Sequence, residues 1–104
     1  MTAYFVTTHY SLYGHIGGEN LRIVGFFPNL DDAVRIVEDN VGDINENGYY
    51  KHATIEMVES GLYPNNHGYD RQTRFYEWNT DQRKYVRIDR RPEWEHFGNF
   101  SGVG

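Results

Sequence analysis

The 104-residue sequence contains no cysteine, and this absence excludes several classes of protein. Without a thiol the chain has no disulfide framework, no thiolate metal site and no cysteine nucleophile. No apolar run approaches the roughly 20 residues that a membrane-spanning helix needs. Residues 1–6 also lack the basic and apolar regions of a secretory signal peptide. These absences predict a soluble protein of the cytoplasm.

Basic residues are too few for a general nucleic-acid-binding protein. Ten Lys and Arg stand against fifteen Asp and Glu, so the formal net charge is −5. Binding to a polyanion requires a surplus of positive charge, and the Arg-rich part near the end of the chain is interspersed with acids. We therefore expect no contact with DNA or RNA and assign the charge to solubility.

Catalytic and metal-binding patterns are missing as well. The three serines, Ser11, Ser60 and Ser101, lie outside any nucleophile-elbow pattern. The five histidines lack the close helical spacing that places two imidazoles on one metal ion, so we expect them on the surface or in loops. The sequence therefore predicts a protein that is not an enzyme and that uses no metal and no cofactor.

Strand-like segments dominate the chain. Residues 3–9 and 21–27 consist largely of β-branched and aromatic residues, which are typical of strands. Residues 52–59 alternate between apolar and polar positions with the period of a strand. Residues 74–79 and 84–88 have the pattern of a hairpin. The sequence thus predicts five strands.

One amphipathic helix is expected over residues 30–41. Asn29 is suited to cap its start, because its short side chain can accept a hydrogen bond from a free backbone N–H. Asp31 and Asp32 add negative charge to the first turn, where the helix dipole favours it. Gly42 is placed to end the helix in the left-handed conformation. Apolar residues recur at helical spacing at Leu30, Ala33, Val34, Val37 and Val41.

The order β-β-α-β-β-β predicts a single α+β domain over residues 1–104. A mostly antiparallel sheet would be covered on one face by the single helix, and residues 93–104 would form a loose tail. Aromatic residues are abundant, with nine Tyr, six Phe and two Trp. Since Tyr and Trp supply many interface contacts, we expect Tyr76, Trp78 and Tyr85 on the face away from the helix, either half-solvated or buried in a homodimer.

Several strand and turn segments resemble small proteins of unknown function from bacterial genomes and their phages. The resemblance covers about residues 3–94, and its motifs are structural. It therefore implies the fold and a single domain, and it implies no activity and no site residue. The segments that carry it are YFVTTHY (4–10), IVGFF (23–27), LDDA (30–33), IEMVESGLYP (55–64), FYEWN (75–79) and KYV (84–86).

Two functional hypotheses follow. The first is a non-enzymatic interaction module that binds itself or another protein through the aromatic sheet face, and the phage resemblance adds inhibition of a host system as a natural role. The second is a protein that binds a nucleotide or another small anion between two long loops, residues 11–20 and 61–73. For this second hypothesis the candidate ligand-binding residues are Tyr13, Gly14, His15, His67 and Tyr69.

Overall fold

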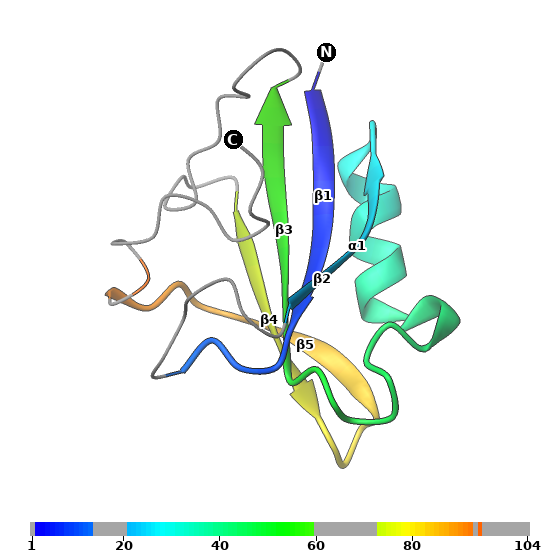
Figure 1. Cartoon of the computed structure of the whole chain (residues 1–104), viewed down its shortest axis with the longest axis vertical. Coiled ribbons are helices and arrows are strands. Elements are labelled where there is room, and N and C mark those ends of the chain that lie inside the picture. The colour runs from blue at the N-terminus through cyan, green and yellow to red at the C-terminus, as the bar shows by residue number, and fades with distance from the viewer. Residues whose placement is uncertain (1, 14–20, 60–72, 93, 95–104) are drawn as a thin grey trace.

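The fold is a two-layer α+β arrangement of an open antiparallel sheet and one helix (Figure 1). The computed structural model describes residues 2–13, 21–59, 73–92 and 94. Within these ranges the sheet has five strands in the order β2-β1-β3-β4-β5. The predicted fold class and order of elements are therefore confirmed. The strands are β1 (Thr2–His9), β2 (Leu21–Phe27), β3 (His52–Glu59), β4 (Arg74–Asn79) and β5 (Lys84–Ile88).

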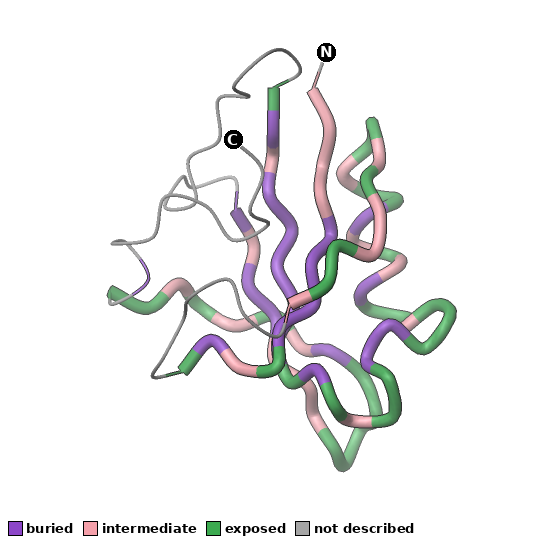
Figure 2. Tube along the Cα trace, in the orientation of Figure 1, coloured by how far each residue is buried: buried purple, intermediate pink, exposed green. Residues whose placement is uncertain are grey.

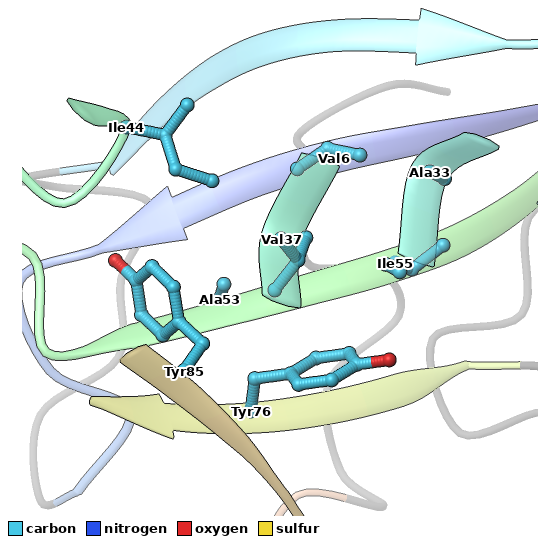
Figure 3. Close-up of a cluster of buried hydrophobic side chains, with 8 residues drawn as sticks. All are labelled: Val6, Ala33, Val37, Ile44, Ala53, Ile55, Tyr76 and Tyr85. Carbon is cyan, nitrogen blue, oxygen red and sulfur yellow. The ribbon is translucent and has the colours of Figure 1, made fainter. Parts of the chain in front are cut away.

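The helix α1 (Leu30–Glu38) covers one face of the sheet. Its apolar stripe buries Ala33 and Val37 completely, and these side chains pack into one cluster with residues of β1, β3, β4 and β5 (Figure 3). Burial of such a stripe is the main source of stability for a helix of this length. The buried members of this core are Val6, Ala33, Val37, Ile44, Ala53, Ile55, Tyr76 and Tyr85.

The helix begins as predicted and ends earlier than predicted. Asn29 accepts a hydrogen bond from the Asp31 N–H at 2.7 Å, which is the expected cap. At the other end, Asn40 adopts the left-handed conformation with φ of 46°, and its Oδ1 accepts a hydrogen bond from the Asn45 N–H. Asn tolerates this conformation because its side chain bonds locally to the backbone. The 3₁₀ turn Val41–Asp43 follows, so the predicted last turn of the helix was wrong. Gly42 has the predicted left-handed conformation, with φ of 66°, but it lies within this turn and does not end α1.

Replacing the capping residue tests the start of α1. We expect Asn29→Ala to lower the free energy of unfolding by about 1 kcal/mol, because the Asp31 N–H loses its acceptor. Urea unfolding followed by circular dichroism measures this loss. Asn29→Ser keeps a side-chain acceptor and should stay close to the parent protein, and equal losses in the two variants would contradict the capping role.

Tyr76, Trp78 and Tyr85 lie on the face that α1 covers, and the prediction that they lie on the face away from the helix is therefore wrong. Tyr76 stands opposite Ala53 in the β3–β4 register, and both belong to the core under α1. Tyr76 and Tyr85 are 0 % and 1 % exposed, and Trp78 is half-buried. Alternation shows which residues share a face, but the face that meets the helix depends on strand register.

On the opposite face of the sheet, several polar residues of β1 and β3 are buried as well. Thr7, His9, Thr54 and Glu56 all have this orientation and are at most 4 % exposed. Figure 2 shows that buried positions follow β3 along most of its length. The sequence pattern had placed Thr54 and Glu56 on a second face of this strand, and the structure adds that this face is shielded from water.

A second apolar cluster lies on this opposite face and contains Leu12, Phe75 and Trp94. The Trp94 indole N–H donates a hydrogen bond to the Leu12 carbonyl at 3.0 Å, and its ring lies 4.6 Å from the Phe75 ring. Trp94 is fully buried and belongs to the segment 93–104 that was predicted to be a loose tail. The other residues of that segment lie outside the described residues.

Candidate functional site

Of the five predicted ligand-binding residues, Tyr13 is the one within the described part of the chain. It directly follows the buried Leu12 after the end of β1, and it is 40 % exposed. The other four candidates, Gly14, His15, His67 and Tyr69, lie outside the described residues. The contacts of Tyr13 therefore define the candidate site.

Tyr13 contacts a buried histidine at the beginning of β3. The ring centroids of Tyr13 and His52 are 4.6 Å apart in an edge-to-face arrangement. The Leu12 N–H donates a hydrogen bond to His52 Nδ1 at 3.1 Å. Because Nδ1 is an acceptor there, we assign the proton of neutral His52 to Nε2. This nitrogen lies 3.3 Å from Oε2 of Glu77.

The environment of His52 favours the neutral imidazole. Burial lowers the pKa of His52, and the Glu77 carboxylate opposes this effect. Protonation of Nδ1 would also place a donor against the Leu12 N–H. His52 is therefore suited to orient the Glu77 carboxylate as a donor, and it is poorly placed to act as a general base.

Glu77 also interacts with Tyr13. This hydrogen-bonding interaction with Glu77 is the largest cause of a raised pKa of the Tyr13 hydroxyl. The Arg91 side chain opposes that rise in pKa, and its guanidinium lies 4.8 Å from the centre of the Tyr13 ring. The Glu77 side chain is nevertheless 40 % exposed. The arrangement thus presents an oriented carboxylate at the surface.

His9 and His52 are neighbours across the β1–β3 pairing, and both are buried in strands. The predicted surface or loop positions were wrong for these two histidines. His9 Nε2 lies 2.9 Å from Thr54 Oγ1, and burial, aided by the nearby His52, lowers the His9 pKa to about 3. His9 is therefore neutral near pH 7 and supports the interior of the sheet.

A cavity of about 360 Å³ opens at the end of the sheet where β3 begins and β4 ends. We call it the end cavity. Its lining includes Thr80 and Arg83 of the turn that connects β4 and β5, and this turn lies at the lower end of the sheet in Figure 1. Side chains from four separate segments contribute to its lining, among them Tyr13, Asp43, Lys51, Glu77, Trp78 and Arg83. Of these residues, the sequence identified Tyr13 as a ligand-binding candidate and Trp78 only as an interface candidate, because the set meets only through the strand register and the loop after α1.

An apolar strip on the outer strand β2 is a second surface of interest. Phe26 is 67 % exposed and Ile23 is 42 % exposed. The Phe26 ring stacks on Phe5 of β1 with centroids 5.5 Å apart, on the face away from α1. We call Phe5, Ile23 and Phe26 the β2 strip. Exposed apolar residues that gather in this way mark contact surfaces more often than isolated ones do.

No protein-family model, no curated protein and no solved structure matches the chain. The helix that the structure describes is too short and too polar to cross a membrane. What the fold and surfaces define is a small α+β protein with an open sheet, an apolar outer strand and a charged cavity at one end.

Proposed function

We propose that this protein is a non-enzymatic interaction module, and that its partner at the β2 strip is a second copy of the same chain. The observation that carries the proposal is the exposure of Phe26, a large apolar ring on an outermost strand. Leaving such a ring in water forgoes roughly 2 kcal/mol of burial energy. A partner that covers it recovers this energy.

The two outer strands differ in the way that the proposal requires. β5 carries two exposed basic residues, Lys84 and Arg87, which discourage a further strand from pairing there. The charged residue of β2 is Arg22, and it forms an ion pair with Glu46 at 3.3 Å. The β2 edge therefore lacks the cluster of charge that protects the β5 edge.

The sequence of β2 is complementary to itself in an antiparallel arrangement. A bulge in the β1–β2 pairing lets Ile23 and Phe26, three residues apart, lie on the same face. If two copies of β2 pair about a point between Val24 and Gly25, Ile23 of each chain stands opposite Phe26 of the other. A single twofold interface then covers Ile23 and Phe26 of both chains. Twofold dimers are the commonest form of self-association.

We expect the protein to sediment at twice its mass of 12.2 kDa at micromolar concentrations. Phe26→Lys should raise the dissociation constant by about 10²–10³-fold, because two interfacial rings are lost and each introduced ammonium group stands opposite Ile23 of the other chain. Sedimentation equilibrium measures this change, and circular dichroism checks that the variant is folded.

The matched control is Val41→Lys, which adds the same charge at another exposed apolar residue, 41 % exposed and outside the β2 strip. It should leave the dimer intact. A parent protein that stays monomeric over this range would contradict the proposal, and so would an equal loss of association in both variants.

A further inference from the structure

Beyond self-association, we propose that the end cavity binds a small zwitterion of the amino-acid type, with the ligand ammonium group paired to Glu77. The observation behind this assignment is the meeting of an oriented carboxylate, exposed cations and aromatic rings around one cavity of about 360 Å³. This volume falls within the range of about 300–1,000 Å³ that is typical of small-molecule sites.

The charges around the cavity select for a ligand that carries both signs. Asp43 and Glu77 contribute two carboxylates, and Lys51 and Arg83 contribute two cations. A ligand of a single sign, such as a free phosphate, is attracted by two of these groups and repelled by the other two. A zwitterion pairs its ammonium group with a carboxylate and its own carboxylate with a cation. The lining therefore favours a zwitterion over an anion in the end cavity.

Glu77 is the natural position for the ammonium group because its carboxylate is already oriented. His52 Nε2 lies 3.3 Å from Oε2, and the Glu77 carboxylate also interacts with the Tyr13 hydroxyl. A carboxylate with two such neighbours loses less freedom when it binds a cation, which lowers the cost of binding. His52 is kept neutral by burial and adds no competing positive charge.

The second carboxylate of the cavity is fixed as well. Oδ1 of Asp43 accepts hydrogen bonds from Asn40 Nδ2 and from the Asn47 N–H, each at 3.3 Å. These bonds hold Asp43 within the loop that follows α1. Because the Asp43 carboxylate already accepts hydrogen bonds within its own loop, it contributes negative charge near the cavity without contacting the ligand. Glu77 is the carboxylate that contacts the ligand ammonium group.

Two aromatic side chains offer contact for the carbon part of the ligand. Tyr13 is 40 % exposed, and Trp78 is half-buried at the other strand. The Trp78 backbone N–H donates a hydrogen bond to the Lys51 carbonyl at 2.8 Å, and the Lys51 ammonium group lies 5.0 Å from the centre of the Tyr10 ring. This arrangement fits an amino acid with an apolar or aromatic side chain.

Isothermal titration calorimetry with three matched compounds tests the proposal. L-phenylalanine carries both charges, phenethylamine lacks the carboxylate, and 3-phenylpropionate lacks the ammonium group. We expect L-phenylalanine to bind at least about tenfold more tightly than either analogue, since each analogue loses one ion pair. The same titration with the other standard amino acids defines the side-chain preference.

Two variants assign the binding to Glu77. Glu77→Gln keeps the acceptor oxygen for His52 and Tyr13 but removes the charge, so it should weaken L-phenylalanine binding by about tenfold or more. Glu59→Gln removes the same charge at the opposite end of β3 and should leave binding unchanged. Thermal unfolding confirms that both variants are folded.

Three outcomes would overturn the assignment. They are the absence of saturable binding by any standard amino acid at millimolar concentration, equal or tighter binding of 3-phenylpropionate, and equal binding by the parent protein and Glu77→Gln. The second of these outcomes would identify an anion site. None of them bears on the β2 strip, because that surface is tested by mass and not by ligand binding.

Discussion

Trp94→Ala is expected to lower the free energy of unfolding by about 3–5 kcal/mol. The Trp94 ring is fully buried against Phe75, and its N–H satisfies the Leu12 carbonyl. The substitution leaves a cavity and also removes the donor from a buried acceptor. Small domains have a total stability of about 5–15 kcal/mol, so this loss should be visible as a large shift of the urea midpoint.

Two further variants define the cause of that loss. Trp94→Phe keeps an aromatic ring without the N–H, and it should cost less than Trp94→Ala. Trp78→Ala removes a tryptophan that is only half-buried, so its effect should also be smaller. If Trp94→Ala lowered the free energy of unfolding by less than about 1 kcal/mol, this result would contradict the buried position of Trp94 against the sheet.

Acid is expected to destabilise the protein through His9. Burial lowers the folded-state pKa of His9 from 6.5 to about 3, so the unfolded chain takes up a proton at a pH where the folded chain does not. The contribution of neutral His9 to the free energy of unfolding is therefore fully present above about pH 6.5. It falls as the pH decreases and levels off below about pH 3. At pH 4.5 the loss amounts to about 2–3 kcal/mol.

His9→Gln isolates this contribution, because glutamine can still bond to Thr54 Oγ1 but does not titrate. Urea unfolding at several pH values between 7 and 4.5 should give a flatter curve for the variant than for the parent protein. Part of the slope should remain, since burial lowers the pKa of His52 as well. Parallel curves for the two proteins would show that His9 does not carry the acid sensitivity.

Local sequence was enough to predict the elements, because their determinants lie within a few residues. The segments 21–27, 52–59, 74–79 and 84–88 are strands with the predicted bounds. The start of α1 was equally local, since it depends on Asn29 and its neighbours. The end of α1 was not, because Asn40 and Gly42 both adopt the left-handed conformation, and the helix ends before the first of them, where Asn40 bonds to the loop that follows.

The site depended on pairing between strands, which a single sequence does not specify. Tyr13 was predicted from the composition of its loop, but its partners were not. His52 stands opposite Glu77 because of the β3–β4 register, and a shift of one residue would separate them. The same register placed Tyr76 and Tyr85 under α1 and so removed the expected aromatic interface.

The unequal charge of the two outer strands has a consequence for how large an assembly can grow. A sheet that is open to addition at both edges can lengthen into a filament, because each added chain offers a new edge. Here the exposed Lys84 and Arg87 lie on β5 at one edge, while the apolar residues Ile23 and Phe26 lie on β2 at the other. Joining two chains through β2 would leave only the basic β5 edges outermost, so growth would stop after one step and the product would be closed.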